Sequence, residues 1–191
     1  MANKLNPANI LTFSRVLFLP LLYLFVLLDL RIAFLIAFIL IGSTDAFDGY
    51  IARKFNYVSD LGKMLDSLAD IFFYISIVWF LYELFPHVLD ANLIILGIAF
   101  IVYFASFLVS LIKCGKPIMM HTTLLRFNAV NVYLMVILSF FMDTSLYLTI
   151  ILIIFMIGFI EEIIIFIKFG QVNPDTKSIF SLINEQKQSK H

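Results

Sequence analysis

Four aspartates with helical spacing are the residues of this 191-residue chain that most clearly point to chemistry. Asp45 and Asp48 are three positions apart and Asp66 and Asp70 are four apart, so on helices each pair shares one face. Both pairs lie in otherwise apolar stretches, where an unpaired carboxylate is costly and usually faces a partner, a cavity or an ion. The turn between the pairs is short. Two antiparallel helices would therefore bring the four carboxylates close together.

The residues around the aspartates suit a metal ion and a phosphate. Close carboxylates repel one another unless cations lie between them. Carboxylate oxygens are the ligands that Mg²⁺, Mn²⁺ and Ca²⁺ prefer, and two metals flanked by acids are a recurring site for phosphoryl chemistry. Gly49, Ala52 and Gly62 would let a bulky group approach the backbone, and Arg53 offers a planar fork for phosphate. We therefore expect a functional divalent-metal site here.

The elements that must hold these residues are apolar segments of membrane-spanning length. Hydrophobic residues make up 62% of the chain and charged residues 14%, against about 45–50% and about 25% in soluble domains. A helix crosses a bilayer with about 20 apolar residues. We predict an all-α integral membrane protein with six transmembrane helices near residues 8–29, 31–52, 64–85, 91–113, 124–142 and 146–168. These helices form one domain over residues 1–170, followed by a polar cytoplasmic tail over 171–191.

Positive charges set the predicted orientation, because loops rich in Lys and Arg stay on the cytoplasmic side of a membrane. With six spans, Arg31 lies on one side and the other 12 of the 13 Lys and Arg residues lie on the opposite side. Both termini are therefore expected in the cytoplasm, and the aspartates lie at the cytoplasmic side of a multi-pass cell-membrane protein. The formal net charge of +0 gives no basic surface for a nucleic-acid partner, and Cys114 is the single cysteine.

The stretch from Asp45 to Asp70 spells D-x2-D-G-x2-A-R-x8-G-x3-D-x3-D without a departure. This pattern resembles the signature of the class I CDP-alcohol phosphotransferases, also called CDP-alcohol phosphatidyltransferases, which are membrane enzymes of phospholipid synthesis. Eight fixed residues across 26 positions make the resemblance specific, and the six-span layout agrees with that family's fold. The resemblance implies an enzyme that transfers a phosphatidyl group from a CDP-linked lipid, such as CDP-diacylglycerol, to the hydroxyl of a small alcohol and releases CMP.

The resemblance also implies roles for the motif residues. The four aspartates would hold two metal ions, Mg²⁺ or Mn²⁺, and Asp70 would be the base that takes the proton from the acceptor hydroxyl. The cytidine diphosphate part of the donor would lie against Gly49, Ala52, Arg53 and Gly62. A homodimer is compatible with the resemblance, because members of the family commonly pair.

The motif does not identify the acceptor alcohol. A basic loop and the start of the fifth predicted helix supply the candidate acceptor contacts Lys116, His121, Arg126 and Asn128. The three cationic side chains would suit an acceptor phosphate or carboxylate, although positive charge is also ordinary in a cytoplasmic loop. Glu161 and Glu162, deep in the last apolar segment, could partner a buried Arg, line the acceptor pocket or make structural hydrogen bonds.

Several acceptors and one unrelated function stay open. Phosphatidylglycerophosphate synthases usually carry Pro after the third aspartate and Lys after the fourth, where this chain has Ser67 and Ile71. The stretch from Leu65 to Asp70 instead resembles phosphatidylserine synthases, whose usual following elements are absent here. A phosphatidylinositol or phosphatidylinositol phosphate synthase is the third candidate. The unrelated alternative is a divalent-cation transporter, which fits poorly because the acids cluster at one membrane face.

Overall fold

The computed structural model describes residues 7–54, 60–115, 118, 120, 122–173 and 176–188, with side chains over 17–43, 72–115, 118, 120, 122–173 and 176–184. Every regular element in these ranges is a helix, which confirms the all-α class. The helices are α1 (Pro7–Leu27), α2 (Arg31–Lys54), α3 (Asp60–Leu84), α4 (Pro86–Asp90), α5 (Leu93–Cys114), α6 (Thr123–Leu138), α7 (Ser145–Phe169) and α8 (Ile179–Gln188). The six longest coincide within a few residues with the six predicted segments, whereas α4 and α8 are additional.

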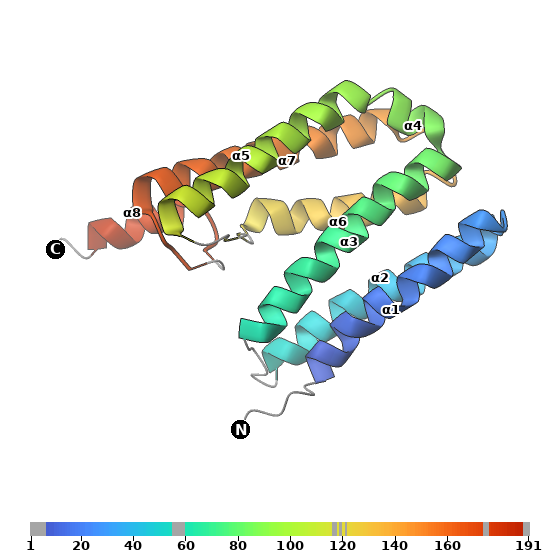
Figure 1. The fold of residues 1–191 in the computed structure, drawn as a ribbon, viewed down its shortest axis with the longest axis horizontal. Helices are drawn as coiled ribbons and strands as arrows, with labels where there is room; N and C mark the ends of the chain where they lie inside the picture. Colours follow the sequence, from blue (N-terminus) through green and yellow to red (C-terminus); the bar gives the residue numbers. More distant parts are fainter. Residues whose placement is uncertain are drawn as a thin grey trace. The chain divides into compact units, whose positions relative to one another are not determined.

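The chain divides into two compact units, Met1–Leu89 and Asp90–His191. The first unit is built on α1, which packs against both α2 and α3 (Figure 1). Its core is aromatic: Phe34 of α2 meets Phe80 of α3 edge-on at 5.0 Å between ring centroids, and Tyr23 of α1 lies 5.0 Å from the same Phe80. The Tyr23 hydroxyl also donates a hydrogen bond of 2.9 Å to Ser76 Oγ. One buried cluster of rings therefore joins all three helices.

A tight turn at Asp29 connects α1 to α2. The Asp29 backbone has φ 53°, a left-handed conformation that Asp tolerates better than most residues. The amide of Leu30 donates to the Phe25 carbonyl at 2.8 Å and the amide of Asp29 to the Val26 carbonyl at 3.0 Å, which together form a Schellman motif. Arg31 Nε adds a 3.0 Å bond to Asp29 Oδ1. The turn satisfies the last carbonyls of α1 and reverses the chain so that α2 runs back along α1.

The packing of Phe34 yields a stability prediction. Its side chain is 0% exposed, so Phe34→Ala should leave a cavity and lower the free energy of unfolding by about 3–5 kcal/mol. The measurement is the thermal unfolding midpoint of the purified protein in detergent. Ile32→Ala is the matched control on the same helix, because Ile32 is 76% exposed and should change the midpoint little. Equal shifts for both variants would contradict the assignment of this core.

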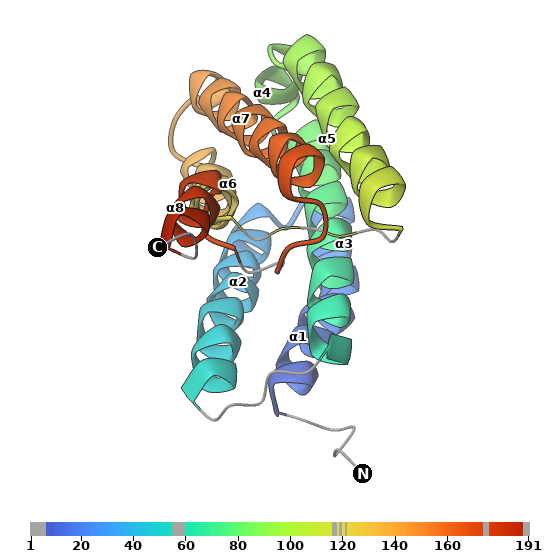
Figure 2. The ribbon, with the colours of Figure 1, turned by 90° about the vertical axis from the view of Figure 1, so that its left-hand side faces the viewer.

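The second unit is organised around α7, which packs against α5, α6 and α8 (Figure 2). Asn92, just before α5, donates 3.0 Å to the Ser145 carbonyl and accepts 2.6 Å from Thr149 Oγ1, so α5 and α7 begin at the same end and run parallel. α6 approaches α7 closely at Gly158, where an added Cβ would lie 2.5 Å from Leu125 Cδ2. The parallel course of α5 and α7 agrees with the predicted alternation, in which they are the fourth and sixth spans.

Many of the exposed side chains on the long helices are large and apolar. Within the described ranges, α5 and α7 are long and apolar enough to cross a membrane. Four shorter apolar stretches lie on the other long helices, at Leu17–Leu27, Arg31–Ser43, Phe72–Leu84 and Thr123–Leu138. Large side chains such as Ile94 (81% exposed) and Ile112 (78% exposed) point outward from α5. Contiguous exposed apolar surface of this kind is typical of membrane contact, and the fold is consistent with a membrane protein.

Candidate active site

The four motif aspartates lie on two helices, as the spacing predicts. α2 is helical through Asp45 and Asp48, and α3 is helical through Asp66 and Asp70. At three and four positions apart on unbroken helices, the members of each pair occupy one face. The side chains of all four lie outside the described set, so their role as metal ligands stays a prediction.

The other motif residues lie on the same two helices. The last turns of α2 contain Gly49, Ala52 and Arg53, and the first turn of α3 contains Gly62. Their side-chain surroundings are likewise outside the described set. The backbone nevertheless places all eight motif residues in the second half of α2 and the first half of α3, the halves that residues 55–59 connect in sequence.

An aromatic contact ties α2 to α3 next to the motif. Phe38 of α2 and Phe73 of α3 are stacked, with ring centroids 5.8 Å apart and an interplanar angle of 13°. Phe73 follows Asp70 by three residues, about 4.5 Å along a helix, and Phe38 precedes Asp45 by seven, about 10 Å. The stacked rings therefore join the two helices within about two turns of the nearest aspartate on each, Asp45 and Asp70.

The donor set of the motif suits a hard divalent cation. It offers four carboxylates and no thiol or imidazole, which is the ligand chemistry of Mg²⁺ or Mn²⁺ rather than of Zn²⁺ or Cu²⁺. Among the side chains that the structure describes, no group of three or more His, Cys, Asp or Glu residues is placed to hold a metal. The four motif aspartates are outside that set, and their carboxylate chemistry is what a hard divalent cation would need.

The predicted acceptor contacts lie in the second unit and are only partly described. Lys116 and His121 fall outside the described residues. Arg126 and Asn128 both lie in α6, but Arg126 is exposed whereas Asn128 is 0% exposed. Asn128 Nδ2 donates 2.9 Å to the Ile151 carbonyl of α7, and its Oδ1 has no hydrogen-bond partner among the described atoms. The two residues thus lie on different faces of α6 rather than lining one wall.

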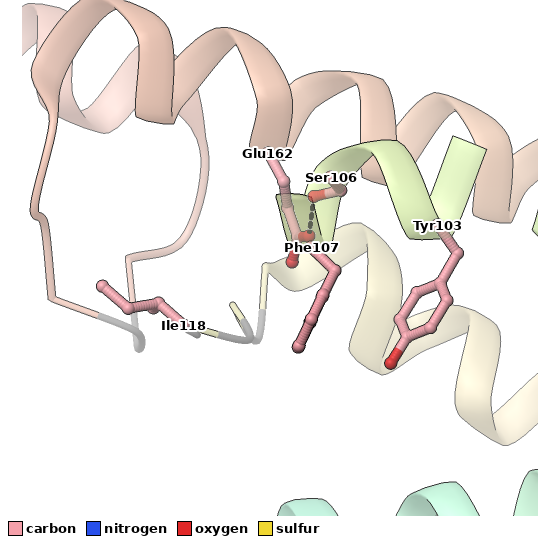
Figure 3. Close-up of a pocket in the computed structure, with 5 residues that line it drawn as sticks. All are labelled: Tyr103, Ser106, Phe107, Ile118 and Glu162. Atoms are coloured by element: carbon pink, nitrogen blue, oxygen red, sulfur yellow. Dashed lines mark hydrogen bonds between the residues drawn. The ribbon is translucent and has the colours of Figure 1, made fainter. Parts of the chain in front are cut away.

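The two glutamates of α7 make structural hydrogen bonds to separate segments. Glu162 is 5% exposed, and its Oε2 accepts 2.8 Å from Ser106 Oγ of α5 (Figure 3). Its Oε1 accepts 3.0 Å from the Met120 amide. Glu161 Oε1 accepts 2.9 Å from the Ile179 amide at the start of α8. The hydrogen-bond interpretation of these glutamates is therefore confirmed. Their partners could not be identified from the sequence, because none is near them along the chain.

A small cavity lies beside Glu162. It is lined by Tyr103, Ser106, Phe107, Ile118 and Glu162 and has a volume of about 10 Å³ (Figure 3). That volume is close to the minimum that one water molecule needs. The cavity is far too small for a nucleotide or a sugar phosphate.

Comparison with known proteins places the region from α1 to α7 in one family. Residues 5–169 match the family described as CDP-alcohol phosphatidyltransferase. A CDP-diacylglycerol–glycerol-3-phosphate 3-phosphatidyltransferase of Rickettsia bellii (strain RML369-C) is 43% identical over 68 residues, which cover 34% of this chain and 38% of that protein. The protein of that name from Bacillus subtilis (strain 168) is 57% identical over 35 residues, 18% of each chain.

One further relative carries a different name. The cardiolipin synthase (CMP-forming) / mitochondrial hydrolase fusion protein of Schizosaccharomyces pombe (strain 972 / ATCC 24843) is 48% identical over 62 residues, 32% of this chain and 10% of that protein. No solved structure matches the chain significantly. The family match spans most of the chain and includes both motif helices. This protein belongs to the CDP-alcohol phosphatidyltransferase family.

Proposed function

We propose that this protein transfers a phosphatidyl group from a CDP-linked lipid, such as CDP-diacylglycerol, to the hydroxyl of a small alcohol and releases CMP. The observation that carries the proposal is the complete eight-residue motif in helical register on α2 and α3, within a family match over residues 5–169. A divalent-cation transporter explains the acids but not the glycines, Ala52 and Arg53 that accompany them.

Glycerol 3-phosphate is the acceptor that we favour, which would make the product phosphatidylglycerophosphate. Relatives from Rickettsia bellii and Bacillus subtilis are named CDP-diacylglycerol–glycerol-3-phosphate 3-phosphatidyltransferase. Ser67 and Ile71 depart from the usual pattern of such enzymes, but their neighbours in the motif are unchanged. A basic stretch that includes Lys116, His121 and Arg126 suits the dianionic phosphate of this acceptor.

The proposed chemistry is a substitution at the lipid phosphate. The acceptor oxygen forms a bond to that phosphorus, the bond to the CMP oxygen breaks, and CMP leaves with the bond's electron pair. Asp70 takes the acceptor's proton, and Arg53 holds a diphosphate oxygen while Gly49, Ala52 and Gly62 leave room for the nucleotide. Asp45, Asp48, Asp66 and Asp70 would hold two divalent ions, Mg²⁺ or Mn²⁺, which when bound neutralise charge on the reacting phosphate and leaving group.

The proposed membrane arrangement has six spans, both termini in the cytoplasm and the active site facing the cytoplasm. The support is the distribution of Lys and Arg together with the parallel course of α5 and α7. A soluble alcohol could then reach the site while the donor's acyl chains stay in the lipid. The domain over residues 1–170, the polar tail over 171–191 and a homodimer stay predictions of the same proposal.

A panel assay of CMP release tests this function. Purified protein with CDP-diacylglycerol and Mg²⁺ or Mn²⁺ is given glycerol 3-phosphate, serine, inositol, inositol 1-phosphate or phosphatidylglycerol in separate reactions. The expected result is a rate with glycerol 3-phosphate that is at least about tenfold above each other acceptor. Phosphatidylglycerol is included because of the cardiolipin synthase relative. A different preferred acceptor would overturn the acceptor assignment, and no release with any acceptor would overturn the proposed reaction.

A further inference from the structure

The short helix α8 is held at the end of α7 by a hydrogen bond and by apolar packing. The Ile179 amide donates 2.9 Å to Glu161 Oε1 of α7, and the Ile179 side chain packs against the buried cluster that contains Phe166. Just before α8, the Lys177 carbonyl accepts 3.0 Å from the Thr123 amide of α6. The stretch that the sequence predicts as a polar tail therefore contains a helix with a fixed place on the second unit.

Another face of α8 presents an exposed aromatic side chain. Leu182 packs on the same cluster as Ile179, whereas Phe180 between them is 73% exposed. Asn184 is also exposed, and it shares a helix face with Phe180 because it follows by four residues. α8 thus buries one face against the cluster and exposes another that includes a large apolar side chain.

Three segments of the second unit present a large apolar side chain near a lysine, and all six side chains are exposed. These pairs are Ile112 with Lys113 on α5, Ile167 with Lys168 on α7, and Phe180 with Lys177 at the start of α8. Such a pair is typical of the boundary between acyl chains and lipid headgroups. The apolar side chain enters the lipid there, while the long lysine side chain extends its ammonium group to the surface.

The three pairs lie at the same end of the second unit. α5 and α7 run parallel, and each ends just after its lysine. The next residues in sequence, Cys114 and Phe169, pack against the same buried cluster as Ile179 of α8. Figures 1 and 2 show α8 at the end of the unit where α5 and α7 finish. One membrane surface can therefore meet all three pairs.

We propose that this end of the second unit lies at the surface of an anionic lipid leaflet, where Phe180 enters the acyl region and the three lysines contact lipid phosphates. α8 is then an interfacial helix rather than a free tail. A lipid surface is favoured over a protein partner because a bilayer surrounds a helix bundle and contacts all three segments at once. The charges are complementary, since each lysine near a membrane surface favours anionic lipid by about fivefold. This placement requires that α5 and α7 span the bilayer, as proposed above.

Tryptophan fluorescence in lipid nanodiscs tests where Phe180 lies. Trp79 is the single tryptophan of the chain, so Phe180→Trp in a Trp79→Phe background reports on one position. A lipid nitroxide near the headgroup should quench this indole more strongly than one at the end of the acyl chain. Ile157→Trp in the same background is the matched control, because Ile157 is 53% exposed in the middle of α7 and should show the opposite order.

The possible results separate the alternatives. Quenching at position 180 by aqueous iodide, and by neither lipid nitroxide, would overturn the interfacial placement. Lipid protection that depends on two copies sharing a nanodisc would assign the surface to a second copy instead. If no lipid nitroxide quenches Ile157→Trp, the spanning arrangement fails and the placement of α8 fails with it. Failure of CMP release alone would count only against the proposed reaction.

A second measurement tests the lysines. The nanodiscs contain equal amounts of phosphatidylcholine and phosphatidylglycerol, and only one of the two lipids is brominated in each preparation. Quenching of the indole at position 180 should show a local preference for phosphatidylglycerol of about fivefold at low salt. The combined variant Lys113→Gln, Lys168→Gln and Lys177→Gln should lose this preference. High salt should weaken it, because exposed charges are screened.

Arg31→Gln is the matched control for the lysine variant. It also removes one exposed cation, but Arg31 already pairs with Asp29 at 3.0 Å and lies in the first unit, so the lipid preference at position 180 should not change. Equal quenching by the two brominated lipids in the protein with all lysines intact would overturn the role of the lysines. An unchanged preference in the combined lysine variant would overturn it as well.

Discussion

Replacing Asp70 with Asn should lower the rate of CMP release by at least about 100-fold while the protein stays folded and inserted in the membrane. The substitution keeps the size of the side chain but removes its ability to take a proton from the acceptor hydroxyl, a role worth about 10²–10⁴ in rate. It also removes one of the four predicted carboxylate ligands of the metal site, so the two losses act in the same direction. Asp70 lies inside α3, and one neutral amide at this position should leave the helix intact.

The measurement is CMP release from CDP-diacylglycerol, with the thermal unfolding midpoint recorded on the same sample. Asp29→Asn is the matched control, because Asp29 lies in the α1–α2 turn away from the motif and Asn also tolerates its left-handed backbone. That variant loses the exposed contact to Arg31, which is worth little, and should keep wild-type turnover. Undiminished turnover in Asp70→Asn would remove Asp70 from the role of base.

Chelation of divalent metal should abolish turnover reversibly. In the proposed site the four motif carboxylates would repel one another when no cation is present, and the phosphate chemistry needs charge neutralisation worth several kcal/mol. We therefore expect activity below detection in excess EDTA and recovery on adding Mg²⁺ or Mn²⁺. Zn²⁺ should restore less, because an all-oxygen donor set suits harder cations.

A titration of metal against activity sharpens this experiment. Asp45→Asn should raise the concentration of Mg²⁺ needed for half-maximal activity, because it removes one negative ligand from α2. Asp90→Asn is the comparison, since Asp90 is exposed at the end of α4 and outside the motif, and it should leave the Mg²⁺ requirement unchanged. Full activity in EDTA would contradict the metal site, and an unchanged Mg²⁺ requirement in Asp45→Asn would remove that residue from it.

The long helices and the motif register were predictable because both depend on local properties. Runs of apolar residues located α1, α2, α3, α5, α6 and α7 to within a few residues. Helical periodicity also predicts that Asp45 and Asp48 share one helix face, as do Asp66 and Asp70. This prediction needs no information about distant contacts. The short α4 and the polar α8 carry no comparable apolar run, and the prediction therefore missed both.

The sequence by itself determined the helical class, the family motif and the sharing of one helix face within each aspartate pair, because those features follow from residue types and spacing along the chain. Only the tertiary structure decided the partners of Glu162, whose hydrogen bonds reach 56 residues back to Ser106 and 42 back to Met120. It likewise separated buried Asn128 from exposed Arg126, although the two are neighbours in sequence. Contacts of this kind depend on how whole helices pack, and local periodicity carries no information about a partner that far along the chain.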